Sequence, residues 1–307
     1  MKIVIALGGN ALGSTPNEQV LNVENCVQHI LPLIKAQHEI IITHGNGPQV
    51  GLINLAFEEA KKINQKIPEM PFPECGAMSQ GYIGFHLQNA LQNLLHQEKI
   101  NKPVISIITQ VEVDRNDLAF MNPTKPIGSF YTKEEALKLP YPTMEDSGRG
   151  YRRVIASPKP LRVVESDVID TLVKQAIVIT VGGGGIPVVK AQDGYKGIPA
   201  VIDKDFASSI LASNIDADRL IILTQVENAK INFRTPDEQD LFKVPLSLLI
   251  KYNEEGHFMK GSMKPKVEAC IEFLKGHKER MAIITSIDRA SEAINGVGGT
   301  YIYNDYE

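Results

Sequence analysis

Short apolar runs alternate along the chain with longer segments in which apolar residues recur every three or four positions. Residues 3–7 form a continuous apolar run, which is typical of a strand buried on both faces. Val23, Val27 and Ile30 follow at spacings of four and three, which predicts the buried face of a helix. The alternation continues to the end of the chain, so we expect βα units and a mainly parallel sheet.

The first half of the chain also predicts a strand over residues 40–43, a helix over residues 76–95 and a strand over residues 104–111. From about residue 112 to residue 160 the pattern changes, because six prolines interrupt any long helix or central strand. We therefore expect a small protruding lobe at about residues 112–160.

The alternation of short apolar runs with segments of helical period returns in the second half of the chain. Asp193 and Gly194 predict a hairpin between residues 187–190 and 195–201. The other expected elements are helices over residues 167–174 and 205–212 and after Met263, strands over residues 177–181 and 220–224, a strand and helix over residues 281–294, and an edge strand over residues 299–303. With no repeat and no low-complexity linker, we expect a single domain over residues 1–307.

The composition excludes several classes of function. The 307 residues are 43% hydrophobic and 22% charged, with a net charge of −4, as in an ordinary soluble protein. Basic residues are dispersed and aromatic residues few, which argues against nucleic acid as a partner. No apolar run reaches the ~20 residues that cross a bilayer, and the first one is too short for a secretory signal. We expect a cytoplasmic protein that does not bind membranes, with Cys26, Cys75 and Cys270 as buried thiols.

Glycine turns follow three of the predicted strands. Backbone N–H groups can converge on an anion only where no side chain obstructs the approach, so glycines between a strand and a helix favour phosphate binding. A single such turn is better explained as a tight connection, but three in equivalent positions favour a ligand. The turns are Gly8-Gly9-Asn10, Gly45-Asn46-Gly47 and Gly182-Gly183-Gly184-Gly185.

The common nucleotide-binding motifs, Gly-x-Gly-x-x-Gly and the P-loop, are absent from the sequence. Phosphoryl transfer nevertheless needs cations that neutralise charge on the moving phosphoryl oxygens, so lysines become the candidates. Lys125 lies between Pro123 and Pro126 in the predicted lobe, where the rigid backbone suits a catalytic cation. Taken without context, it would be a solvated surface lysine.

Two further lysines stand at helix starts. Lys204 and Asp205 follow Asp203 at a strand-to-helix junction, where Asp203 suits the cap but does not account for the whole cluster. Lys266 follows the Gly261-Ser262-Met263 turn, and its charge opposes the helix dipole unless an anion is bound there.

Other polar residues have structural interpretations. His44 has no metal-ligating neighbours at suitable spacing, so we interpret it as a hydrogen-bonded loop anchor. Arg149, Arg152, Arg153 and Lys159 either shape the hinge of the lobe, the safer interpretation, or meet substrate phosphate.

Taken together, these segments closely resemble carbamate kinases, members of the amino acid kinase family. The matching stretches are residues 6–11, 43–51, the Lys125 segment, residues 157–160, 182–189, 201–208 and 261–263. Their joint order and spacing span nearly the whole chain and are highly specific.

The resemblance implies a three-layer α/β/α sandwich with a mainly parallel central sheet. It also implies reversible phosphoryl transfer from carbamoyl phosphate to ADP, which gives ATP and carbamate, the latter decomposing to ammonia and CO2. The transfer is direct and in line, with Mg2+ held mainly by the nucleotide phosphates and no protein metal ligands assigned. Relatives are homodimers, and the helix over residues 76–95 is a candidate interface.

The resemblance also assigns roles by position. Lys125, Lys204, Asp205 and Lys266 would be catalytic, with Asp205 organising the lysines. Carbamoyl phosphate would be bound on the N-terminal side, and the nucleotide within about residues 177–307. The substrate-binding residues would be Gly8, Gly9, Asn10, Gly45, Asn46 and Gly47, and the nucleotide-binding residues Gly182, Gly183, Gly184, Thr224, Asn232, Phe233, Gly261, Ser262 and Met263.

Two positions depart from relatives: Lys264 adds a charge beside the phosphate turn, and Arg234 stands where relatives often have glycine. Two alternatives stay open. One is another acyl-phosphate-forming kinase of the same fold, acting on a small carboxylate or a nucleotide. The other is a catalytically idle sensor of carbamoyl phosphate or nucleotide.

Overall fold

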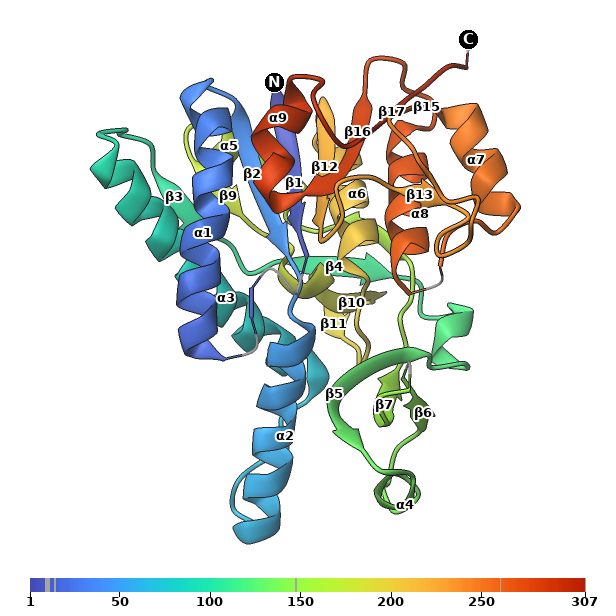
Figure 1. Ribbon diagram of the computed structural model, residues 1–307. Helices are drawn as coiled ribbons and strands as arrows, with labels where there is room; N and C mark the ends of the chain where they lie inside the picture. Colours follow the sequence, from blue (N-terminus) through green and yellow to red (C-terminus); the bar gives the residue numbers. More distant parts are fainter. Residues whose placement is uncertain (9–11, 14, 147, 260, 307) are drawn as a thin grey trace.

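The computed structural model describes residues 1–8, 12–13, 15–146, 148–259 and 261–306. Within these residues, eight strands form the main sheet, in the order β15-β17-β16-β12-β1-β2-β9-β3 (Figure 1). Their bounds are Lys243–Pro245, Thr300–Tyr303, Met281–Ser286, Arg219–Thr224, Lys2–Leu7, Glu39–His44, Ile177–Ile179 and Val104–Ser106 in that order. The strands from β16 to β3 are parallel, whereas β17 is antiparallel to β16 and parallel to β15.

Helices cover both faces of this sheet. The alternation of side chains along β1 shows the division, because Val4 packs in the cluster on one face and Ile3 and Ile5 in the cluster on the other. The first face is covered by α5 (Ser166–Val173), α6 (Lys204–Asn214), α7 (Leu246–Glu254) and α8 (Met263–Leu274), and the second by α1 (Pro16–Lys35), α3 (Phe72–Gln97) and α9 (Ala290–Ile294). The predicted three-layer α/β/α sandwich is confirmed.

The central strands are completely buried. Ile3, Ile5 and Leu7 of β1 have no exposed surface, and burying such a side chain contributes roughly 1.5–3 kcal/mol relative to leaving it exposed. The carboxyl ends of β1, β2 and β12 are therefore held by a well-packed core on both faces.

Two smaller sheets lie below the carboxyl ends of the main sheet (Figure 1). The first has the order β11-β10-β4-β8 and the second the order β5-β7-β6. Their strands are β11 (Gly194–Gly197), β10 (Ile186–Ala191), β4 (Gln110–Val113) and β8 (Pro160–Val163), then β5 (Lys125–Tyr131), β7 (Tyr151–Ile155) and β6 (Thr143–Glu145). The remaining elements are α2 (Gly47–Ile63), α4 (Lys133–Ala136), the 3-10 turns η2 (Leu118–Phe120), η3 (Gly182–Gly184) and η4 (Ile287–Arg289), and the ribbon of β13 (Lys230–Ile231) and β14 (Gln239–Asp240).

The β5-β7-β6 sheet with α4 projects away from the main sheet, and α2 runs down beside it (Figure 1). We refer to β5, α4, β6 and β7 as the lobe. It covers a narrower range than residues 112–160, because β4 and β8 at the ends of that range pair with each other in the four-stranded sheet. The backbones of α2 and β5 touch, since a Cβ atom on Gly51 would lie 2.5 Å from Gly128 Cα.

Two of the expected strands differ in the structure. The strand predicted over residues 104–111 is two strands, because the chain leaves the main sheet after β3 and enters the four-stranded sheet at β4. Between them Thr109 exchanges hydrogen bonds with the buried Gln80 side chain, which replaces the lost strand pairing. The strand ending at Tyr303 does not form the edge, since the three-residue β15 pairs outside it and is too short to show a period in the sequence.

None of the helices in the described ranges is both long enough and apolar enough to span a membrane.

Candidate active site

The first two glycine turns meet at the carboxyl edge of the main sheet. Gly8 follows β1 and Gly45 follows β2, and the Gly45 N–H donates a hydrogen bond of 3.2 Å to the Leu7 carbonyl. Parallel strands end at the same edge, so their turns can converge on one ligand. Gly9 and Asn10, which also belong to the predicted substrate side, lie outside the described residues.

The third glycine turn packs against the second. A Cβ atom on Gly182 would lie 2.4 Å from His44 Nε2, and one on Gly183 would lie 2.0 Å from Asn46 Nδ2. Glycine is needed here first of all because the His44 and Asn46 side chains occupy the space that a Cβ would fill. The turn therefore lies beside Asn46, on the side predicted for the substrate.

Three adjoining cavities lie along this edge. The first, of about 330 Å³, is lined by Asn46, Lys125 and Gly183, and we refer to it as the lobe cavity. The second, of about 570 Å³, is lined by Gly8 and Thr224 and is the central cavity. The third, of about 120 Å³, is the apolar cavity; among its lining residues are Thr224, Val226, Phe233, Phe258, Met259 and Met263.

The turn before α8 connects the three cavities. Ser262 lines all of them, Gly261 lines the lobe and central cavities, and Met263 lines the apolar one. Three of the predicted nucleotide residues, Gly182, Gly184 and Asn232, line none of these cavities, and the Asn232 side chain donates to the Asp237 carbonyl.

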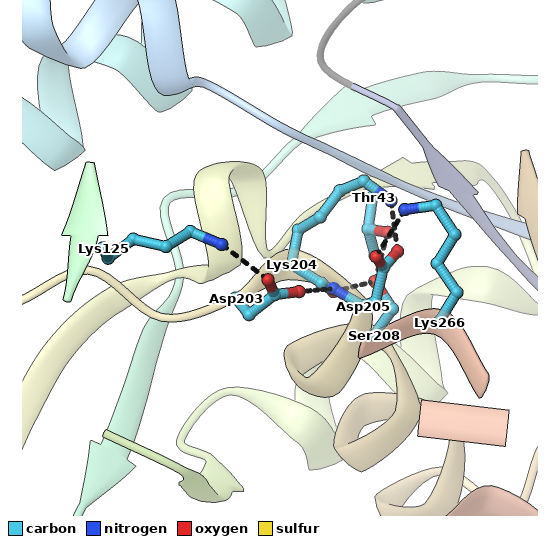
Figure 2. Close-up of polar contacts among 7 residues, drawn as sticks. All are labelled: Thr43, Lys125, Asp203, Lys204, Asp205, Ser208 and Lys266. Carbon is cyan, nitrogen blue, oxygen red and sulfur yellow. Dashed lines mark hydrogen bonds and ion pairs between the residues drawn. The ribbon is translucent and has the colours of Figure 1, made fainter. Parts of the chain in front are cut away.

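Lys204, Asp205 and Lys266 form a cluster between the lobe and central cavities (Figure 2). The two carboxylate oxygens of Asp205 are divided between the lysines: Oδ1 accepts from Lys204 Nζ, and Oδ2 accepts from Lys266 Nζ at 2.9 Å. The Lys204 and Asp205 side chains are only 9% and 4% exposed. Asp205 thus sets the spacing of two ammonium groups and supplies the partner that Lys266 needs at the start of α8.

Burial and charge act against each other in this cluster. Burial lowers the pKa of the Lys204 ammonium, and the nearby Lys266 charge lowers it further, although Asp205 opposes both. Burial alone would raise the pKa of the Asp205 carboxyl, but the two lysines outweigh it and hold that pKa below its usual value. Asp205 is therefore ionised at neutral pH and stabilises both cations.

Local hydrogen bonds fix the first turn of α6. The Asp203 side chain caps this helix by accepting from the Asp205 N–H at 2.9 Å. Ser208 Oγ donates to the Lys204 carbonyl at 2.6 Å, so the 2.6 Å contact with Thr43 Oγ1 is donated by the threonine. The helix start is thereby tied to the end of β2.

Lys125 reaches the same region from the lobe. It is the first residue of β5, and its Nζ donates to Asp203 Oδ2 at 2.7 Å (Figure 2). Its side chain is 38% exposed, far more than that of Lys204. The sequence interpretation of Asp203 as a cap missed this second contact, although the Asp203-Lys204-Asp205 pattern was visible.

His44 and the lobe arginines have structural partners. His44 is buried, and its Nδ1 lies 3.0 Å from the Gly45 carbonyl, to which it must donate. Burial lowers the pKa of this imidazole to about 4, so it is neutral at physiological pH. Arg153 bonds to Asn54 and Glu58 of α2, which attaches the lobe to that helix.

Neither of the two departures noted in the sequence lines the three cavities. Lys264 lies 3.8 Å from Glu268, one helical turn along α8. Arg234 lies over the Phe233 ring, 5.2 Å from its centroid, and has a positive φ of 63°. Phe233 lines the apolar cavity, so Arg234 borders that cavity from outside.

Comparison with known proteins identifies the fold. The model of the amino acid kinase family matches residues 1–285. The chain belongs to the amino acid kinase family. Among its relatives, the carbamate kinase-like protein of Escherichia coli is 54% identical over 305 residues and the carbamate kinase of Staphylococcus haemolyticus is 50% identical over 306 residues. These alignments cover 98% of this chain and 98% and 99% of the respective relatives.

Solved structures of related proteins have the same fold as this chain. The carbamate kinase of Giardia lamblia bound to AMP-PNP superposes with a TM-score of 0.92 at 43% identity, covering 99% of this chain and 98% of that one. An aspartate kinase from Synechocystis, at 13% identity and a TM-score of 0.54, shares the fold alone. The resemblance to carbamate kinases predicted from the sequence is confirmed.

Proposed function

We propose that this protein is a carbamate kinase that transfers a phosphoryl group between carbamoyl phosphate and ADP, giving carbamate and ATP. The observation that carries the proposal is the lysine cluster between the lobe and central cavities. Lys204 and Lys266 line both cavities and Lys125 lines the lobe cavity. Their three ammonium groups are matched by two carboxylates. Such a surplus of positive charge suits a group whose charge spreads over phosphoryl oxygens during transfer.

The arrangement of the cavities supports one substrate on each side of the cluster. The lobe cavity, which the Gly45-Asn46-Gly47 turn lines, would hold carbamoyl phosphate, with the backbone N–H groups of Asn46, Gly47 and Gly183 as candidate donors. Gly8 lines the central cavity with Lys204 and Lys266, where the transferring phosphoryl group would lie. Gly9 and Asn10 continue the same turn in the sequence.

The nucleotide would lie in the apolar cavity and the adjoining part of the central cavity, on the side of the lysine cluster away from the lobe. The apolar cavity offers Phe233 and Met263 to an adenine ring, and Thr224 links it to the central cavity, where Gly261 and Ser262 would meet the phosphates. Gly182 and Gly184 pack closely against His44 and Ile202, and Asn232, which donates to the Asp237 carbonyl, holds the segment next to Phe233.

The residues of the site perform a direct transfer. Carbamate is itself the nucleophile, so positioning and charge neutralisation matter more than a strong base. Lys204 and Lys266, spaced by Asp205, would bind phosphoryl oxygens on both sides of the transfer, while Lys125 approaches from the lobe. The described residues hold no group of three or more possible metal ligands, and lysines occupy both oxygens of Asp205. A magnesium ion would fit as one carried by the nucleotide phosphates and water, where it supplies further charge neutralisation.

A coupled assay tests the proposal. We expect ATP to form from carbamoyl phosphate and ADP in proportion to enzyme, and no comparable transfer from ATP to acetylglutamate, glutamate, aspartate or UMP. Transfer to one of those acceptors, with none from carbamoyl phosphate, would instead favour another kinase of the fold. Binding of carbamoyl phosphate or ADP without any transfer would favour an idle sensor.

We also propose a homodimer formed through α3. This helix exposes Phe85 at 61% and Met78 at 37% on its surface, and large exposed apolar side chains favour an interface. Sedimentation should show a dimer for the wild-type protein and a monomer for Phe85→Glu. The three buried thiols suit the reducing cytoplasm, where we place the protein.

A further inference from the structure

Asp203 connects two parts of the site that come from different elements (Figure 2). Its Oδ2 accepts from Lys125 Nζ at 2.7 Å, and its Oδ1 accepts from the Asp205 N–H at 2.9 Å. Lys125 begins the first strand of the lobe, whereas Asp203 caps α6, the helix that carries Lys204 and Asp205. One carboxylate therefore links the lobe lysine to the lysine cluster.

The ion pair with Asp203 is the contact that fixes the position of the Lys125 ammonium group. Within the described part of the chain, Asp203 is the only acid within ion-pairing distance of its ammonium group. A lysine side chain has many rotamers, so the position of its charge is decided by the acceptor that it finds. The backbone of β5 brings Lys125 to the edge of the lobe cavity, and Asp203 determines where its charge lies within it.

Resting on the proposed function, we propose that Asp203 is a positioning residue, which places the Lys125 ammonium beside the cluster before substrate binds. The pair is partly exposed, at 38% for Lys125 and 16% for Asp203, so its strength is reduced by solvent. A phosphoryl group that enters the cavity can then share the ammonium without the cost of breaking a buried ion pair. Asp203 acts through Lys125 and does not need to touch the substrate.

A purely structural role has to be separated from this one, because Asp203 also caps α6. Asn is about as effective an N-cap as Asp, and its single carbonyl oxygen can still accept from the Asp205 N–H. The amide nitrogen cannot accept from Lys125. The substitution Asp203→Asn thus retains the cap and removes the ion pair, whereas Asp203→Ala removes both.

A double-mutant cycle on ATP formation tests the proposal, with wild type, Asp203→Asn, Lys125→Ala and the double variant. In the presence of Lys125, we expect Asp203→Asn to lower kcat about tenfold and to leave KM for ADP within about twofold. In the Lys125→Ala background, the same substitution should change kcat by less than about twofold. A tenfold loss in both backgrounds would show that Asp203 acts only through the helix, and would overturn the proposal.

A labelling experiment tests the same contact without activity. In the ligand-free protein, acetylation of Lys125 by an N-hydroxysuccinimide ester is measured by peptide mass spectrometry relative to Lys251, whose side chain is 65% exposed. Loss of the carboxylate frees the amine, so Asp203→Asn should raise this ratio about threefold. An unchanged ratio would overturn the proposal. A wild-type enzyme that forms no ATP would refute the proposed function while leaving this labelling result to decide the role of Asp203.

Discussion

The lysines that we propose to be catalytic fall into two groups, which are held in different ways. Lys204, the first residue of α6, is buried, and Asp205 divides its oxygens between Lys204 and Lys266. Lys125 is more than a third exposed, stands on a three-stranded sheet outside the main core, and reaches the cavity with one ion pair. The first group is fixed by the fold, whereas the second is placed by local contacts.

This difference indicates that the two groups of lysines act at different stages of the reaction. Buried, spaced cations bind charge that is present throughout the reaction, because they cannot rearrange cheaply. An exposed cation with one exchangeable partner can respond to the charge that develops during transfer. We therefore expect the cluster to influence stability, binding and rate together, and the lobe lysine to influence mainly the rate.

The largest effect is expected for Asp205→Ala. Removing one partner of a buried ion pair leaves an uncompensated charge, so the free energy of unfolding should fall by about 3–5 kcal/mol. Loss of lysine spacing should also lower kcat by about a thousandfold. Urea unfolding and the ATP assay measure the two effects. Glu98→Ala is the control, since its ion pair with Lys35 is exposed and should cost less than about 1 kcal/mol. Equal losses of stability in Asp205→Ala and Glu98→Ala would contradict the distinction between the buried cluster and an exposed ion pair.

Lys125→Ala should separate the two groups most clearly. We expect kcat to fall by about a hundredfold or more, with the Kd for ADP within about twofold of wild type, because the lost charge acts on the reacting group. Its stability should change by less than about 1 kcal/mol. Lys133→Ala, an exposed lysine on α4 of the same lobe, should behave as wild type. Weaker ADP binding at an unchanged kcat would contradict this assignment.

The sequence predicted most of the fixed group and little of the geometry of the lobe. Buried strands and helix faces have a strong period, so the three layers and the turns at the strand ends could be derived from residue order. Lys204 and Lys266 both stand in the first turns of helices, and the resemblance to carbamate kinases assigned both of them to phosphate contact.

Contacts between distant segments could not be derived in this way. The residue pattern shows Gly182 and Gly183 only as part of a glycine turn, and their lack of side chains also makes room for His44 and Asn46. The second role of Asp203 depends on Lys125, 78 residues earlier in the chain. Neither pairing leaves a period in the sequence, because each depends on how two turns meet in space.

The pH dependence of stability tests whether His44 belongs to the fixed region. Its folded pKa is lowered to about 4 by burial, whereas an unfolded histidine titrates near 6.5. Between these values only the unfolded state binds the proton, so stability falls as the pH drops, by roughly 1.4 kcal/mol per unit. Urea unfolding of wild type should therefore lose about 2 kcal/mol more than His44→Asn between pH 7 and pH 5. His277→Gln, an exposed site, should follow wild type, and equal pH slopes for all three proteins would exclude this role.

The smallest effect concerns how the lobe is seated on α2. A Cβ atom on Gly51 would lie 2.5 Å from Gly128 Cα, so Gly51→Ala must push β5, and Lys125 with it, away from the helix. We expect kcat to fall about tenfold with ADP affinity unchanged, since a small displacement of a catalytic group is costly. Gly76→Ala is the matched control, because a Cβ atom on this helix glycine of α3 would make only an ordinary contact, 3.9 Å from Ile186 Cγ1; alanine there should leave kcat unchanged. If Gly51→Ala keeps full kcat, then Lys125 finds its place independently of β5, and Asp203 alone decides where the charge of the lobe lies.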